Sequence, residues 1–111
     1  MSKGGGIVIA AAAGIAIRSF NDIPEALAAC LGAAGLILTE ADLAPAFFEL
    51  RSGLAGELFQ KFINYKVRVA LVLPDPAAYG ERFNELAYEH ASHGMIRFVR
   101  SLAEAKAWLG T

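Results

Sequence analysis

The sequence contains one cysteine, two histidines and no long apolar run, and each shortage excludes a class of protein. A lone cysteine, Cys30, cannot form a disulfide within the chain, and its alanine and leucine neighbours predict a small buried side chain. His90 and His93 are three residues apart, but two histidines do not complete a metal site, so we expect exposed polar residues near a helix end. The apolar run over residues 7–17 is too short to span a bilayer.

Charge of either sign is also scarce and almost balanced, with ten basic and eleven acidic residues and a net charge of −1. A nucleic-acid-binding domain needs a basic patch, which this balance argues against. The apolar fraction of 56% predicts a packed core, and 111 residues suit one domain. We expect a flexible tail over residues 1–5, a single domain over residues 6–111, a cytoplasmic location and no contact with a membrane.

Short β-branched runs alternate with helical patterns along the chain, which is typical of an α/β fold with a mostly parallel sheet. The first two runs are expected to pair as a hairpin. The order is ββαβαβαβα, with helices packed on a mixed sheet of about five strands. The predicted strands cover residues 7–12, 15–20, 36–39, 67–73 and 95–99, and the predicted helices begin at residues 22, 53, 78 and 102.

A polar turn, Arg51-Ser52-Gly53, opens the amphipathic helix predicted over residues 53–65, with Ser52 as its N-cap. A helix N-terminus offers unpaired N–H groups and partial positive charge, and Arg51 adds a full charge. Asp75 follows the clearest strand, at the sheet edge where α/β proteins bind ligands. Arg51, Ser52, Gly53 and Asp75 are therefore candidate residues for an anion or ligand site. The alternative is that Ser52 only caps the helix.

The same helix carries a polar stripe at spacings of three and four: Glu57, Gln60, Lys61 and Asn64. We interpret the stripe as a candidate partner-binding surface, and the alternative is a solvated face stabilised by a Glu57–Lys61 pair. Gly56 interrupts this helix at a cost of about 0.5–1 kcal/mol relative to alanine. Close approach of another backbone would explain it, from the sheet, a neighbouring loop or a second subunit, and we favour the first two.

The element order and the turn over residues 50–54 resemble the STAS-like domains of anti-sigma-factor antagonists, as does the closing stretch over residues 98–105. Residues 47–65 are closer to the hallmark of a small bacterial family catalogued as domain of unknown function 4180, FF-D/E-L-K/R-S/T-G-L/I-AGE-x-x-QKF-x-NY. The resemblance implies a STAS-like domain and no particular activity. Where phosphorylated antagonists carry their acceptor serine, this chain has Arg51, so a phosphorylation switch is not carried over to Ser52.

No catalytic residues emerge from the sequence. It shows no Ser-His-Asp arrangement, no GxSxG turn and no glycine-rich phosphate loop, and no cofactor is implied. We therefore expect a non-catalytic regulatory or protein-interaction module with an unknown protein partner. The alternative is a small-ligand or anion-binding domain. Within that alternative, an enzyme is less expected than a domain that only binds. A mean hydropathy of +0.45 adds the expectation of a homodimer or larger homo-oligomer.

Overall fold

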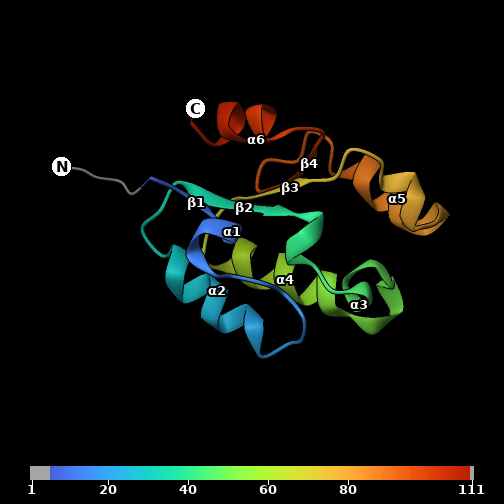
Figure 1. Ribbon diagram of the computed structural model, residues 1–111, viewed down its shortest axis with the longest axis horizontal. Coiled ribbons are helices and arrows are strands. Elements are labelled where there is room, and N and C mark those ends of the chain that lie inside the picture. Colours follow the sequence, from blue (N-terminus) through green and yellow to red (C-terminus); the bar gives the residue numbers. More distant parts are fainter. Residues whose placement is uncertain (1–5, 111) are drawn as a thin grey trace.

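A computed structural model of the chain describes residues 6–110, so the tail expected over residues 1–5 lies outside the described part. The centre of the fold is a four-stranded sheet in the order β1-β2-β3-β4, and every neighbouring pair of strands is parallel. The strands are short and lie side by side in the order of the sequence (Figure 1). They are β1 (Ile7–Ile9), β2 (Gly35–Thr39), β3 (Val69–Val72) and β4 (Ile96–Val99).

Helices surround this sheet unevenly. In Figure 1, α6 lies on one side of the sheet, α1, α2 and α4 lie on the other, and α3 and α5 lie towards one end. The α-helices are α1 (Ala10–Ala13), α2 (Asp22–Cys30), α3 (Pro45–Phe48), α4 (Leu54–Asn64), α5 (Glu81–Glu89) and α6 (Leu102–Leu109). Three 3₁₀ turns follow strands or precede helices: η1 (Glu40–Asp42), η2 (Leu50–Ser52) and η3 (Pro76–Tyr79).

The predicted N-terminal hairpin is wrong, and the fifth strand is lost with it. Ile7–Ile9 is a strand, but Ala10–Ala13 turns at once into helix α1, which ends at Gly14 with a left-handed φ of 74°. Alanine has the highest helix propensity, so four in a row favour the helix over a second strand. Residues 15–20 contribute one isolated bridge, a parallel pairing of Ile17 with Leu43.

Strand side chains alternate between two hydrophobic cores. Leu36, Leu38, Val69 and Leu71 face a large core shared with α1, α2, α4 and α5, whereas Ile37, Ala70 and Val72 face a smaller one shared with α6. All of these strand residues are buried, as expected for a parallel sheet that is covered on both faces. The smaller core depends on one helix of eight residues, which makes the attachment of α6 important.

Arg68 fastens the C-terminal end of α6 to the sheet. Its guanidinium donates to the carbonyl oxygens of Trp108 at 3.3 Å and Leu109 at 2.8 Å, where the helix leaves carbonyl groups unpaired. The guanidinium carbons of Arg68 and Arg97 lie 5.3 and 4.6 Å from the centre of the Trp108 ring. Trp108 therefore helps to dock the last helix onto the sheet.

The later elements follow the sequence pattern more closely. The helix predicted over residues 53–65 is α4, shorter by one residue at each end. The helix predicted to begin at residue 78 is divided, because Gly80, with φ 105°, separates η3 from α5. Within residues 6–110, no helix has both the length and the apolar character needed to cross a membrane.

Candidate functional site

The turn before α4 is built around the hydroxyl group of Ser52. Its Oγ donates to the carbonyl oxygen of Ala46 at 2.6 Å and accepts the backbone N–H of Leu54 at 3.2 Å. Gly53, not Ser52, is the N-cap of α4, and its left-handed φ of 81° is a conformation that glycine tolerates best. Ser52 precedes the N-cap by one residue, and its hydroxyl accepts one N–H of the first helical turn, that of Leu54.

The one hydrogen of the Ser52 hydroxyl is already donated within the turn. In this arrangement the hydroxyl has no hydrogen left to donate to an anion at the predicted site. Arg51 is exposed and lines a shallow hollow of about 910 Å³ together with Arg82 from α5. Asp75 is exposed and is not among the residues that line this hollow. Arg51 and a second cation thus line the same hollow. The role of Arg51, Ser52, Gly53 and Asp75 stays a prediction.

A ring cluster that the sequence analysis missed forms one wall of the same hollow. Tyr79 stacks on Phe48 with ring centres 3.8 Å apart and planes inclined by 8°. The Tyr79 hydroxyl donates to Oε2 of Glu40, and this hydrogen bond is the main reason why the pKa of Tyr79 rises from 10.0 to about 12. The carboxylate follows β2 and the phenol follows β3, so the bond joins the carboxyl ends of two neighbouring strands.

The predicted polar stripe runs along the outer side of α4. Gln60 and Asn64 are exposed, and Glu57 and Lys61 are half-buried. Among residues 6–110, no ion pair joins Glu57 to Lys61, so the helix-stabilising pair considered in the sequence analysis is not formed. The side chains of the stripe are left available to solvent or to a partner.

Gly56 on the same helix has no intramolecular explanation within the described chain. A Cβ atom added at this position would meet nothing within 4 Å, and the residue is exposed. The favoured expectation, close approach of the sheet or a neighbouring loop, is therefore wrong. Gly35 shows the contrast, because an added Cβ there would lie 2.5 Å from Leu109 Cδ2 and 2.9 Å from the Arg68 carbonyl oxygen.

The two histidines support the backbone near β4. His93 Nδ1 accepts the N–H groups of Met95 and Ile96 at 3.0 and 3.1 Å, and the His90 carbonyl oxygen accepts the N–H of Phe98 at 3.3 Å. These bonds occupy backbone donors along the free edge of the sheet, which would otherwise invite pairing with another chain. No cluster of three or more metal-ligating side chains occurs in residues 6–110.

A second hollow of about 430 Å³ lies between α5 and the carboxyl ends of β3 and β4. Its apolar floor includes Leu73, Phe98 and Val99, and its rim includes Tyr88 and Arg100. None of these residues was predicted from the sequence to be functional. Asp75 was predicted at this end of the sheet as part of a ligand site, and it does not line this hollow. The helix that closes the hollow was expected from the sequence, but its role in lining a hollow was not.

Comparison with known proteins gives one match. The family model described as "Domain of unknown function (DUF4180)" matches residues 3–109 of the chain, almost its whole length. Neither the curated proteins nor the solved structures contain a significant match.

Proposed function

This chain belongs to the DUF4180 family, whose description supplies no activity, and we propose from the geometry that the domain is a non-catalytic regulatory or protein-interaction module. Its contact surface is the outer side of α4, which we call the α4 surface and define by Gly56, Gln60 and Ile63 together with the stripe Glu57, Lys61 and Asn64. The partner is another protein, and a second copy of this chain is one candidate.

The observation that carries this proposal is Gly56. A glycine inside an exposed helix destabilises it by about 0.5–1 kcal/mol relative to alanine. No described atom of this chain needs the space above Gly56. A partner whose backbone or side chain lies directly on α4 would need that space, because any Cβ would hold it away from the helix.

The neighbours of Gly56 are those of an interface. Gln60 and Ile63 lie four and seven residues further along α4, on the same side of the helix. Ile63 is 38% exposed, and Tyr65, immediately after the helix, is 59% exposed. Exposed apolar and aromatic side chains bordered by polar ones match the core and rim of protein interfaces.

A STAS-like identity and a bacterial cytoplasmic setting belong to the same proposal. The support for STAS-likeness is a parallel sheet with alternating helices and a short polar turn before the helix that precedes β3. Ser52 donates its hydrogen to Ala46, so a phosphoryl group on Oγ would remove that bond. Modification of Ser52 would therefore act by loosening the turn at the start of the α4 surface.

The alternative function is anion binding beside the same turn. It is favoured by one observation, the presence of both Arg51 and Arg82 around the hollow next to Tyr79. Glu49 and Glu81 line the same hollow and oppose an anion. A titration with inorganic phosphate tests it: Arg51→Glu should abolish any phosphate-dependent rise in the melting temperature, and no rise in the native protein would reject it.

Charge reversal on the α4 surface tests the main proposal. The double variant Gln60→Glu, Lys61→Glu should lose the proteins recovered with the tagged native domain from its own cells. The control, Arg18→Glu, places the reversal at an exposed residue outside α4 and should retain them. Recovery of the same proteins with the α4 double variant would reject the surface, and light scattering of the native protein tests whether the partner is a second copy.

A further inference from the structure

The groove between α5 and the carboxyl ends of β3 and β4 has the composition of a docking site. Its volume of about 430 Å³ falls within the range of about 300–1,000 Å³ that is usual for binding pockets. The floor is apolar. Phe98 and Val99 come from β4, Ala87 comes from α5, and Leu73 directly follows β3. The groove lies at the sheet edge where α/β proteins place their ligands.

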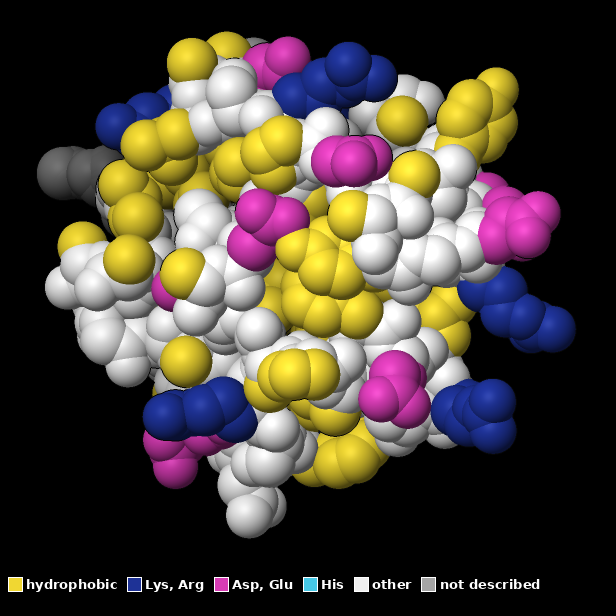
Figure 2. Space-filling model, turned by 45° about the vertical axis from the view of Figure 1, so that its right-hand side comes forward, with side chains coloured by type: hydrophobic (Ala, Val, Ile, Leu, Met, Phe, Trp, Pro, Cys, Tyr) yellow, Lys and Arg dark blue, Asp and Glu magenta, His cyan; other side chains and the backbone are white. Residues whose placement is uncertain are grey.

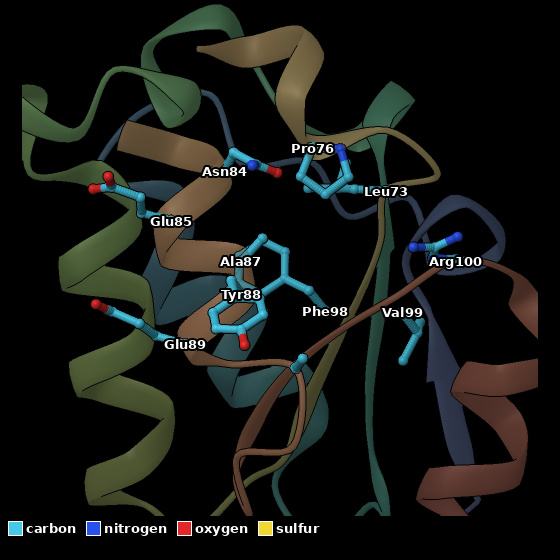
Figure 3. A pocket seen from close by; sticks show the side chains of 11 residues that line it. Leu73, Pro76, Asn84, Glu85, Ala87, Tyr88, Glu89, Phe98, Val99 and Arg100 are labelled. Atoms are coloured by element: carbon cyan, nitrogen blue, oxygen red, sulfur yellow. The ribbon is translucent and has the colours of Figure 1, made fainter. Parts of the chain in front are cut away.

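Tyr88 is the most exposed large hydrophobic side chain at this groove. It is 84% exposed, and Figure 3 shows its side chain on α5, on the side of the helix that lines the groove. Tyrosine offers a large rigid contact area at low cost in side-chain entropy, and such residues are common anchors at the centre of interfaces. The ring makes no hydrogen bond or ring contact with the described part of the chain.

Two carboxylates and one guanidinium flank this ring. Glu85 and Glu89 are one turn apart on α5, and Figure 3 shows them on the side of Tyr88 opposite to Arg100. Like charges at this spacing destabilise a helix. Neither carboxylate is paired with a cation anywhere in residues 6–110, and the guanidinium of Arg100 is likewise without a carboxylate partner there.

We infer that this groove docks a basic segment of a protein partner, with a Lys or Arg against Glu85 and Glu89 and an apolar side chain seated beside Tyr88. Charge complementarity selects this occupant, because the α5 side of the groove carries two unpaired negative charges beside an aromatic ring that attracts cations. An acidic residue on the far side of the same segment would face Arg100. Across the groove, the docked segment would therefore present a basic, then an apolar, then an acidic side chain.

This docking site is separate from the α4 surface and does not rest on it. The groove is lined from α5, β3 and β4, and none of Gly56, Gln60 and Ile63 takes part in it. Figure 2 shows one face of the molecule, on which exposed apolar side chains are interspersed with separate acidic and basic groups. A partner that binds both the groove and the α4 surface would need two distinct contact segments.

Selection from a random linear-peptide library displayed on phage tests the inference with the full chain as the target. The enriched peptides are expected to carry Lys or Arg close to an aromatic or aliphatic residue. A synthetic peptide of the enriched sequence should bind at about 0.15 M salt, where exposed charges more than a few ångströms apart are already partly screened. Its affinity for the double variant Glu85→Lys, Glu89→Lys should be at least about tenfold lower than for the native protein. The single variant Tyr88→Ala should weaken binding by a similar factor.

The matched control is Glu25→Lys, an equivalent charge reversal on the exposed part of α2, which should leave the affinity unchanged. Replacing the basic residue of the peptide by Glu should restore binding to the double α5 variant. If that variant fails to fold by circular dichroism, Glu85→Gln, Glu89→Gln takes its place. Failure to enrich any peptide, enrichment of peptides without a basic residue, or equal affinity for the α5 variants would each overturn the inference.

Discussion

The hydroxyl of Ser52 donates to the carbonyl oxygen of Ala46, 2.6 Å away, and this bond ties η2 back to α3. The same oxygen accepts the N–H of Leu54 at the start of α4. Ser52, a candidate residue for the anion site, is thus also the residue that holds the turn together. Independent measurements of folding stability and of partner binding would separate a structural role of Ser52 from a regulatory one.

Replacement of Ser52 by alanine removes both hydrogen bonds and leaves the Ala46 carbonyl oxygen without its side-chain donor. We expect a loss of about 1–2 kcal/mol in the free energy of unfolding, measured by urea denaturation. Ser92→Ala is the control, because Ser92 is exposed and its hydroxyl makes no hydrogen bond within residues 6–110. Equal stability of the two variants would show that the bonds of Ser52 contribute nothing measurable.

Two glycines should respond in opposite ways to substitution by alanine. Gly35→Ala places Cβ 2.9 Å from the Arg68 carbonyl oxygen and against Leu109, so we expect a loss of about 1–3 kcal/mol in unfolding free energy. Gly56→Ala meets no atom within 4 Å and should stabilise α4 by about 0.5–1 kcal/mol. Thermal and urea denaturation measure both, and a destabilised Gly56→Ala variant would remove the argument for a partner above α4.

Tyr79 should ionise at an unusually high pH. Its hydrogen bond to Glu40 favours the neutral phenol and raises the pKa to about 12 from 10.0. Because the folded-state pKa lies above the unfolded one, the stabilisation is complete below pH 10 and disappears as the pH rises from about 10 to about 12. Absorbance titration should show this step in the native protein, at lower pH in Glu40→Gln and not at all in Tyr79→Phe.

Cys30 should be unreactive in the folded state. It is fully buried in the large core, and burial raises the pKa of its thiol from 9.0 to about 11, so the thiolate needed for reaction is scarce at neutral pH. A colorimetric thiol reagent should modify the native protein slowly and the guanidinium-unfolded protein at once. Equal rates would mean that α2 opens far more readily than its packing indicates.

Hydrophobic patterning in the sequence was sufficient to locate some elements of the fold and failed for others. Patterning located α4 to within one residue at each end, because its apolar residues recur at spacings of three and four. The same patterning failed at Ala10–Ala13, where an apolar run fits a strand and a helix equally well and only alanine propensity distinguishes them. The number of strands was overestimated because the run over residues 15–20, predicted as the second arm of the hairpin, forms only the isolated bridge of Ile17 with Leu43.

The candidate sites were harder to predict than the fold. Ser52 was predicted as the N-cap of α4, but Gly53 takes that position and Ser52 lies one residue earlier. The bond of Ser52 to Ala46 depends on how α3 returns towards α4, which no local pattern encodes. The hollow beside Tyr88 unites residues from β3, α5 and β4 that are separated by up to 27 positions, from Leu73 to Arg100. Such groupings follow from the order of strands in the sheet and cannot be deduced from spacing along the chain.

The central claim is that a protein partner lies directly on α4, and site-specific photo-crosslinking in the native cells tests it most directly. A photoreactive phenylalanine analogue placed at Gln60 should give a discrete adduct that disappears when Gly56 is also replaced by leucine. The same analogue at Ala103, exposed on α6, serves as the control and should give none. No adduct from Gln60, or the same adduct from both positions, would contradict the account.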